Sequence, residues 1–463
     1  MLKISPQIIA IDYKEPVVYF NMLKNMQNMV FFDSAACGEA TGSYSFIGLE
    51  PDFILTKKNG VIKKNNITID NLSLWDLLKK FPKVDNIPNI PPFQGGFAGF
   101  LSYDLIKELE KIPNIATDEF NHDDAAFGYY NLVLSFDHIN KTAWLISTGY
   151  TEKNGFDAEY AKKQADKILK IIKTPTTKTI NNPKVSKLSS NFNQESYKHI
   201  VAKAKNYILE GDIFEVNIAQ RFHGTIEGSS ADLYLKLRNA NSAPFCAYSN
   251  IGTSTILSTS PERFLRLKGS LIETRPIKGT IARGTTPEED MLHANKLQNS
   301  HKDIAENIMI VDLMRNDLSK IAELNSVNVA KLCGLESYKN VHHLVSVIQG
   351  NLKPKYDAID LIKACFPGGS ITGAPKIRAT EIIEELETVR RGPYCGSMMY
   401  ISNNGCMDSS ILIRTVVVKD NQISLHSGGA ITLDSDPMQE YLETVTKVDI
   451  LINSLNSEET ITI

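Results

Sequence analysis

The sequence predicts an α/β protein of the α+β kind, with large antiparallel sheets packed as a sandwich and helices outside. Three observations lead to this prediction. Short runs of alternating polar and apolar residues recur along the chain, which is typical of strands with one buried face. Tight turns such as Lys268-Gly269 and Asn404-Gly405 join such runs, and short turns connect antiparallel neighbours. Amphipathic helix patterns separate the strand clusters, and 463 residues suffice for a large core.

Residues 1–173 are predicted to form an N-terminal α+β region. Its expected elements are strands at 17–20, 44–47 and 53–55 and helices at 72–81 and 157–173. The pattern G-G-x-x-G at residues 95–99 has no clear strand before it and no Walker lysine after it, so close backbone packing explains it better than a phosphate loop. Residues 174–190 are polar and contain two prolines, which predicts a linker or surface loop.

Residues 191–463 form the second predicted region. Its expected elements are a helix at 195–211, strands at 214–222, 254–259, 264–267 and 271–277, a helix at 286–317 with a break near residue 300, a helix at 358–365, a three-strand antiparallel meander at 395–401, 411–419 and 423–426, and a last helix from Pro437 to about residue 455.

Composition narrows the class of protein. Fifty basic and 53 acidic residues give a net charge of −3 without basic blocks, which argues against nucleic acid or an anionic membrane as partner and favours a small-molecule substrate. No apolar run reaches the length of a membrane span, and the first residues lack a signal-peptide pattern. The cysteines, at positions 37, 246, 333, 365, 395 and 406, lie far apart, which suits reduced thiols. We expect a soluble cytoplasmic protein.

A strand-like run from Glu273 to Thr280 presents Lys278 beside Gly279. By default such a lysine is a surface ammonium with a pKa of about 10.4. To act as a nucleophile near neutral pH, its pKa must fall by about 3, which corresponds to roughly 4 kcal/mol and requires burial or a neighbouring cation. The spacing leaves both interpretations open.

Two predicted helices carry acidic residues three positions apart, Asp303 with Glu306 and Glu440 with Glu443. Residues i and i+3 share one face of a helix. Alone, each pair fits a solvated surface. If the two helices meet, the four carboxylates supply hard oxygen ligands for an ion such as Mg²⁺.

Several further residues could bind an anion. Arg414 is expected on an apolar strand face with Leu412 and Val416, where it needs either an internal carboxylate or a carboxylate or phosphate of a substrate. Residues 428–430, Gly-Gly-Ala, offer bare backbone N–H groups nearby. The glycine-rich run 367–376 leads into a helix, so it could bind an anion or serve as a plain helix entry. His343 matches no zinc pattern, which leaves a lone catalytic or hydrogen-bonding imidazole.

Read in order, these motifs resemble the chorismate-utilising enzymes, which include the anthranilate synthase large component, aminodeoxychorismate synthase component I, isochorismate synthase and salicylate synthase. The resemblance spans residues 190 to 455, and its main motifs are Gly211–Arg221, Ser260–Phe264, Glu273–Thr280, Glu306–Asp317, His343–Ser346, Pro367–Lys376, Ile413–Thr415, Ser427–Ala430 and Glu440–Glu443. It implies an anthranilate synthase component I-like fold.

The resemblance also implies residue roles. It makes Glu306 and Glu443 direct Mg²⁺ ligands, with Asp303 and Glu440 acting through water, and the metal is expected to hold the ring carboxylate of chorismate; the family more often has Glu at position 303. Arg414, Tyr400 and the amides of Gly428, Gly429 and Ala430 are expected to bind the enolpyruvyl carboxylate. Thr372 and Lys376 lie in a matching substrate loop. His343 matches the family's ring-facing histidine, and Glu262 the general acid that protonates the departing C4 hydroxyl, which requires a raised pKa.

The reaction expected from the resemblance depends on Lys278. Anthranilate and isochorismate synthases have Pro-Ile-Ala-Gly at this motif, whereas aminodeoxychorismate synthases have Pro-Ile-Lys-Gly, as this chain does at 276–279. The resemblance therefore implies amination of chorismate to 4-amino-4-deoxychorismate, in folate and p-aminobenzoate biosynthesis, through a covalent intermediate on Lys278. Isochorismate and salicylate synthases have a water-activating lysine where this chain has Glu215, so water is disfavoured as nucleophile.

Ammonia needs a source, and the chain has no G-x-C-x-G-x-Q elbow of a glutaminase. The resemblance therefore implies a separate glutamine amidotransferase subunit. It also implies a tryptophan pocket near Ser34, Pro244 and Phe245, which could be structural, inhibitory or vestigial. Two alternatives remain: an anthranilate synthase, which aminates C2 and then eliminates pyruvate, and a non-catalytic tryptophan-binding subunit.

Overall fold

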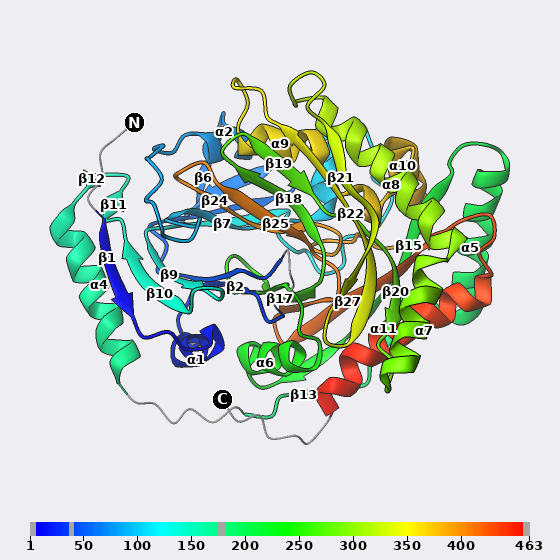
Figure 1. The fold of residues 1–463 in the computed structure, drawn as a ribbon, viewed down its shortest axis with the longest axis horizontal. Coiled ribbons are helices and arrows are strands. Elements are labelled where there is room, and N and C mark those ends of the chain that lie inside the picture. The colour runs from blue at the N-terminus through cyan, green and yellow to red at the C-terminus, as the bar shows by residue number, and fades with distance from the viewer. Residues whose placement is uncertain (1–5, 37–40, 175–180, 457–463) are drawn as a thin grey trace.

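Two large antiparallel sheets dominate the computed structural model, which describes residues 6–36, 41–174 and 181–456 (Figure 1). Helices surround them, with α1 and α4 at one end and α5, α7, α8, α10 and α11 at the other. This arrangement confirms the predicted fold class. Among the described residues, no helix is long and apolar enough to cross a membrane, and the five cysteines there form no disulfide.

Sheet 1 is built from strands of both halves of the chain. In spatial order its main strands are β1 (Gln7–Ile11), β10 (Thr142–Ser147), β9 (Leu132–Asp137), β3 (Tyr44–Leu49), β2 (Val30–Asp33), β16 (Phe245–Ser249), β17 (Thr255–Ser260), β26 (Thr415–Lys419), β27 (Gln422–Ile431), β15 (Glu215–Glu227) and β13 (Lys184–Val185), with β14 (Ser189–Ser190) and β23 (Gly373–Ala374) also paired to β15.

Sheet 2 is likewise built from strands of both halves of the chain. Its order is β20 (Ile277–Ala282), β22 (Val341–Asn351), β19 (Leu271–Thr274), β18 (Arg263–Lys268), β25 (Met407–Ile411), β24 (Ser397–Ser402), β7 (Gly96–Leu101), β8 (Ala125–Tyr130), β4 (Ile54–Lys58), β5 (Val61–Lys64) and β6 (Ile67–Ile69), with β21 (Asn328–Ser337) paired to β22. A separate small hairpin joins β11 (Tyr150–Thr151) and β12 (Gly155–Phe156).

The two halves of the chain therefore share both sheets. β2 lies between β3 and β16, and β7 lies between β8 and β24, so the predicted regions 1–173 and 191–463 are not separate sandwiches. The predicted linker is partly structured, because β13 and β14 pair with β15; residues 175–180 lie outside the described part.

The helices are α1 (Pro16–Leu23), α2 (Leu74–Lys79), α3 (Ile106–Leu109), α4 (Ala158–Lys173), α5 (Gln194–Leu209), α6 (Ser230–Ala240), α7 (Pro287–Gln298), α8 (His301–Ser319), α9 (Ala358–Cys365), α10 (Lys376–Leu386) and α11 (Pro437–Asn456), with 3₁₀ turns η1 (Tyr103–Leu105) and η2 (Gly369–Ile371). The predicted break near residue 300 is confirmed: Ser300 caps α8 by accepting a hydrogen bond from the amide of Asp303.

Apolar side chains fill the space between the sheets and under the helices. Val30 and Phe46 of sheet 1 pack with Ala98 and Met398 of sheet 2 in one buried cluster, as the predicted sandwich requires. Gly99 explains part of the G-G-x-x-G pattern: a Cβ there would lie 2.0 Å from the carbonyl oxygen of Ala126. Close backbone packing, and not a phosphate loop, is therefore the reason for this glycine.

The predicted three-strand meander is wrong in one respect. β24 and β25 belong to sheet 2, whereas β26 and β27 belong to sheet 1, so the expected strand 411–419 is divided. The chain passes from one sheet to the other at residues 412–414, and Arg414 there has a φ of +49°. Arg414 therefore does not share a strand face with Leu412 and Val416. The strand pattern misled because both sheets have apolar faces at this point.

Candidate active site

Lys278 lies at a break in the pairing of β20 with β22. The two strands pair at Ile277 and again from Thr280, and the register shifts in between. Such a bulge changes the direction of a side chain. Gly279 has a φ of +81°, and a Cβ there would lie 3.0 Å from Asp303. The glycine lets β20 pass close to α8, while Lys278 is only 8% exposed.

Two carboxylates hold the ammonium of Lys278. Its Nζ lies 2.6 Å from Oε1 of Glu215 on β15 and 4.0 Å from Oε2 of Glu306 on α8. Burial acts to lower the pKa of Lys278, but the two negative charges outweigh burial and the pKa is raised. The lowered pKa that a nucleophilic lysine needs near neutral pH is therefore not provided by this arrangement. Lys278 is a charged lysine paired with Glu215.

Glu262 lies directly before β18 and is buried beside the lysine strand, since it accepts a hydrogen bond from Ile277. Its Oε1 accepts a hydrogen bond of 2.6 Å from Ser370 Oγ and one of 3.4 Å from the amide of Ile277. Burial raises the pKa of Glu262 to about 7, although these hydrogen bonds and the charge of Lys278 oppose the rise. A carboxyl group with this pKa is partly protonated at neutral pH, as a general acid must be.

His343 lies on β22 opposite Thr280 and is fully buried. Its Nδ1 and the hydroxyl of Thr280 are 2.8 Å apart. Burial, and then the charge of Arg414, lowers the pKa of His343 to about 3. The imidazole is therefore neutral at physiological pH and can exchange a hydrogen bond with a ligand, but it cannot supply a positive charge.

The two acidic pairs approach the same region through glycines. Gly279 backs onto Asp303, and a Cβ on Gly429 would lie 2.8 Å from Oε2 of Glu440 and 3.7 Å from Oε1 of Glu443. The charge of Lys302 acts on one member of each acidic pair. Its Nζ is 3.8 Å from Oε1 of Glu306, and its charge partly offsets the rise that burial causes in the pKa of Glu440.

These four carboxylates suit magnesium in their chemistry but do not converge on one point. Their oxygens are the donors that Mg²⁺ prefers, and Oε1 of Glu306 is buried without a hydrogen-bond partner. Lys278 and Lys302 lie against Glu306, and Lys447 Nζ is 2.7 Å from Glu443. In the part of the chain that the structure describes, no three acidic, histidine or cysteine side chains are arranged to hold a metal ion. Metal binding would require these carboxylates to turn away from the lysines.

Arg414 has no carboxylate partner among the described residues, whereas every other arginine of the chain forms an ion pair. Burial lowers its pKa, which is the effect of removing a guanidinium from water. From the sequence, the partner of Arg414 could be an internal carboxylate or a substrate anion. The described residues provide no such carboxylate. An unpaired, largely buried guanidinium suits the carboxylate of a ligand.

Gly428, Gly429 and Ala430 lie on β27 opposite β15. On β15, the amide of Ala219 donates to Glu387 and the amide of Asn217 to the carbonyl of Thr372, so both residues face away from β27. In an antiparallel pair, two residues opposite each other either both point their amides toward the other strand or both point them away. The amides of Gly428 and Ala430, the partners of Ala219 and Asn217, therefore point away from β15, to the opposite edge of β27. β26 begins only at Thr415 and its pairing with β27 starts at Val416, so this edge is open beside Arg414. Two of the three expected amides therefore point to this open edge.

Lys376 and Thr372 are used within their own loop. The ammonium of Lys376 binds Asp317 and the carbonyl oxygens of Cys365 and Pro367, which occupies all three of its hydrogens. The hydroxyl of Thr372 donates to the carbonyls of Gly368 or Gly369. The expectation that the Lys376 side chain binds substrate is therefore wrong: it holds the glycine-rich loop against α8.

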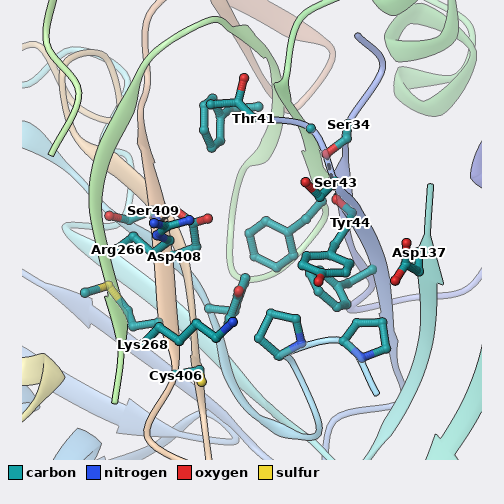
Figure 2. A pocket seen from close by; sticks show the side chains of 18 of the residues that line it. Ser34, Thr41, Ser43, Tyr44, Asp137, Arg266, Lys268, Cys406, Asp408 and Ser409 are labelled. Carbon is teal, nitrogen blue, oxygen red and sulfur yellow. Dashed lines mark hydrogen bonds between the residues drawn. The ribbon is translucent and has the colours of Figure 1, made fainter. Parts of the chain in front are cut away.

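A second concave region lies away from Lys278. It is a cavity of about 1030 Å³ whose lining includes the three predicted tryptophan-pocket residues, Ser34, Pro244 and Phe245. Figure 2 shows Ser34, Ser43 and Tyr44 on one side, facing Arg266 and Asp408 across it. The remaining lining combines aromatic residues with polar and charged ones, and its aromatic members include Phe32, Phe46, Trp144 and Tyr400. We call this region the aromatic cavity.

Tyr400 belongs to the aromatic cavity and not to the arginine site. Its ring packs 5.0 Å from that of Phe93, 5.3 Å from Phe46 and 5.7 Å from Phe32, and it is 6% exposed. The prediction that Tyr400 joins Arg414 is therefore wrong, because its strand, β24, directs this ring between the sheets.

Sequence reasoning missed Glu215 as part of the site. It considered this residue only as a replacement for a lysine, although a glutamate beside apolar residues at the start of a strand can indicate a buried partner. The structure leaves Oε2 of Glu215 buried without a hydrogen-bond partner. Ser370 was missed as well, and its glycine-rich surroundings gave no sign that it binds Glu262.

The comparisons with known proteins agree with this geometry. The family model described as chorismate binding enzyme matches residues 27–453, which covers strands of both sheets and the whole site. The chain belongs to this family. The resemblance stated from the motifs is thereby confirmed, and the match also includes most of the N-terminal region.

Among curated members of this family, aminodeoxychorismate synthase component 1 of Escherichia coli (strain K12) is 38% identical over 98% of this chain and 100% of its own length. Anthranilate synthase component 1 of Aquifex aeolicus (strain VF5) is 36% identical over 97% and 94%. The crystal structure of anthranilate synthase component I from Streptococcus pneumoniae TIGR4 has a TM-score of 0.80 and 31% identity, and covers 89% of this chain and 92% of that one. The expected component I-like fold is confirmed.

Proposed function

We propose that this enzyme converts chorismate and ammonia to 4-amino-4-deoxychorismate, with Mg²⁺, through a covalent intermediate on Lys278, in the cytoplasm and on the route to p-aminobenzoate and folate. The observation that carries the proposal is the placement of Lys278 on the β20 bulge, buried between Glu215 and Glu306 and beside Glu262. Relatives named aminodeoxychorismate synthase component 1 at 38% and 42% identity support it.

The raised pKa of Lys278 requires a proton acceptor before attack, and Glu215 is the carboxylate within hydrogen-bond distance. After this transfer the neutral amine attacks C2 of chorismate, and the two ring double bonds shift. The bond from C4 to its hydroxyl breaks, and the proton of Glu262 leaves with that hydroxyl as water. Ammonia then attacks C4, the double bonds shift back, and the C2–N bond to Lys278 breaks.

Charged groups of the chain are proposed to orient the substrate. Arg414 and the amides of Gly428 and Ala430 face one edge of β27, where they suit the enolpyruvyl carboxylate. Glu306 and Glu443, with Asp303 and Glu440 through water, would hold Mg²⁺, which when bound neutralises the ring carboxylate. The neutral imidazole of His343 is proposed to face the ring and to hydrogen-bond with one of the ring's oxygen substituents.

A partner subunit completes the proposal. The chain has no glutaminase elbow, and its relatives are named as component 1, which implies a second component. We propose that this partner is a glutamine amidotransferase that delivers ammonia. We further propose that the aromatic cavity binds tryptophan, because Phe32, Phe245 and Trp144 line it.

Product identification tests the reaction. The purified protein receives chorismate, ammonium and Mg²⁺, and a lyase is then added to part of the mixture. We expect a product that the lyase converts to p-aminobenzoate. Fluorescent anthranilate formed without the lyase would instead support the anthranilate synthase alternative, which the 36% identity to an enzyme of that name keeps open.

Intact-mass measurement during turnover tests the covalent step. The native protein should gain a chorismate-derived adduct that Lys278→Ala cannot form. Lys198→Ala, on the outer surface of α5, serves as the matched control and should form the adduct normally. Normal amination by Lys278→Ala would exclude the covalent route.

A further inference from the structure

Arg391 is a buried arginine after α10 that has no role in the proposed reaction. It is 2% exposed, and its guanidinium donates to Glu387 from Nε over 2.9 Å and from Nη2 over 2.6 Å. The rings of Tyr103 and Tyr394 lie 4.6 and 5.8 Å from its Cζ. A buried ion pair is weak evidence for stability, because desolvation offsets much of the attraction. The other bonds of Arg391 therefore indicate what else it does.

These other bonds go to two backbone segments of the active site. Nη2 donates over 2.8 Å to the carbonyl of Asn217 on β15, and Nη1 donates over 3.0 Å to the carbonyl of Ile371. β15 is paired on both sides within sheet 1, whereas Ile371 is the last residue of the turn η2 in the glycine-rich loop 367–376. One guanidinium therefore fastens this loop to the sheet.

The glycine-rich loop depends on such fastening. It contains three glycines, whose backbone is conformationally permissive. Ser370, directly before Ile371, donates the 2.6 Å hydrogen bond to Glu262. Lys376 binds the carbonyls of Cys365 and Pro367 and so holds only the ends of the loop. The bond from Arg391 is therefore the one that acts next to Ser370.

We propose that Arg391 is a positioning residue for the general acid: by bonding the carbonyls of Ile371 and Asn217 together, it holds Ser370 against Glu262. Arg391 itself does not contact Glu262. Besides burial, the groups that set the pKa of Glu262 are Ser370, the amide of Ile277 and the charge of Lys278. An effect of Arg391 on this acid is therefore expected to pass through Ser370. The inference rests on the proposed function, because it takes Glu262 as the acid.

The double variant Arg391→Met/Glu387→Gln isolates the bond to the loop. It leaves no buried charge unpaired, and the side-chain oxygen at position 387 can still accept from the amide of Ala219, as that of Glu387 does. With Glu262 as the acid, kcat falls above its pKa of about 7. Loss of the Ser370 bond raises this pKa, so the fall in kcat should move upward by about half a pH unit. KM for chorismate should stay within about 2-fold.

Lys24→Met/Asp232→Asn is the matched control. It removes another buried ion pair, between the end of α1 and α6, that does not contact the glycine-rich loop. It is expected to lower the free energy of unfolding without moving the pH profile of kcat. An equal movement in this control would show that the profile reports stability and would contradict the assignment of Arg391.

A double-mutant cycle with Ser370→Ala tests the route. If Arg391 acts through Ser370, the Arg391→Met/Glu387→Gln changes should move the pH profile of Ser370→Ala by less than about 0.2 unit, because residues that share one path are not additive. A further upward movement of about half a unit would mean that Arg391 acts on Glu262 directly, and the positioning role would be wrong.

Hydrogen exchange on the free protein provides a readout without turnover. Residues 369–372 should exchange faster in Arg391→Met/Glu387→Gln than in the native protein or the Lys24→Met/Asp232→Asn control, and native exchange there would refute the proposal. If the double variant does not fold, Arg391→Lys decides. An ammonium has three hydrogens for the four bonds of Arg391, so the same upward movement, at least about 0.2 unit, is expected. A native profile in Arg391→Lys would then refute it.

The outcomes separate this proposal from the proposed reaction. If kcat of the native enzyme shows no fall above pH 7, the role of Glu262 as acid fails. The role of Arg391 is then decided by infrared titration of the Glu262 carboxyl in the free protein, with Glu262→Gln as the blank. A higher pKa of Glu262 in Arg391→Met/Glu387→Gln supports the positioning role, and an unchanged pKa rejects it.

Discussion

The active site and the aromatic cavity differ in whether their buried charged groups have partners within the protein. In the active site, Arg414 has no carboxylate partner among the described residues, and buried oxygens of Glu215 and Glu306 have no hydrogen-bond partner. At the cavity, Arg263 holds both oxygens of Asp408 and a third bond to Glu273. Burying unsatisfied polar groups costs free energy, which a charged ligand can offset. The first region therefore suits an ionic substrate, whereas the buried arginine at the second is already paired within the protein.

Removal of divalent ions should separate the two regions most strongly. Chelation with EDTA is expected to reduce turnover of chorismate by about 10³-fold or more, because metal neutralisation of a carboxylate contributes several kcal/mol. Binding of L-tryptophan in the aromatic cavity should be unchanged, since no proposed metal ligand lines it. Calorimetry and turnover on the same sample measure both. The metal proposal would be contradicted if the enzyme kept full activity in EDTA and adding Mg²⁺ back changed nothing.

Two arginines provide the next contrast. Arg414→Ala should lower kcat/KM for chorismate about 100-fold, as loss of charged hydrogen bonds costs about 3 kcal/mol, with little change in the free energy of unfolding. Arg263→Ala leaves Asp408 and Glu273 without their buried partner and should lower the free energy of unfolding by about 3 kcal/mol. Kinetics and denaturant titration measure the two effects. A large loss of stability in Arg414→Ala would show that this arginine has an internal partner.

The pH dependence of kcat should report the protonation state of Glu262. Its pKa is raised to about 7, and the acid must be protonated, so kcat is expected to be highest below pH 7 and to fall up to 10-fold per pH unit above it. His343, with a pKa of about 3, stays neutral throughout and adds no step. The measurement requires saturating Mg²⁺, because the pKa of Glu306 is also about 7, and a constant concentration of free ammonia. A flat profile between pH 6 and 9 would exclude Glu262 as the acid.

The smallest expected effect concerns Ser370. Its hydrogen bond to Glu262 acts to lower the pKa of that carboxyl, so Ser370→Ala should raise it and move the fall in kcat upward by about half a pH unit. Ser319→Ala, at the end of α8, is the control and should leave the profile in place. Movement in the acidic direction would mean that Ser370 destabilises the carboxylate.

The sequence predicted what local pattern encodes. Alternation and turn residues gave strands of both sheets such as β17 and β18, but the strand expected at 17–20 is wrong, because these residues form part of helix α1. Ser300 was recognised as a helix break because capping depends on neighbouring residues. It could not predict that residues 412–414 pass between sheets, since strand patterning is the same on either side of that crossing. The sharing of both sheets by the two halves of the chain is likewise a matter of long-range pairing.

In the site, the types of residue were predictable but their pairing was not. Glu262 was expected to have a raised pKa, and burial provides it. Whether the pKa of Lys278 falls was left open by the sequence, because the direction of the shift depends on Glu215, 63 residues away, which spacing cannot place. Tyr400 and Lys376 were misplaced for the same reason, because a motif identifies a loop or strand without giving the direction of each side chain.

The position of β7 in sheet 2 has a consequence during synthesis. Its neighbour β8 ends at Tyr130, but its other neighbour, β24, begins only at Ser397. Since β7 ends at Leu101, about 300 residues separate β7 from β24. At 5–20 residues per second the ribosome needs about 15–60 s to synthesise β24 after β7. Throughout that interval this edge of β7 lacks the partner that pairs with it in the folded protein, and an unpaired strand edge can pair with another chain.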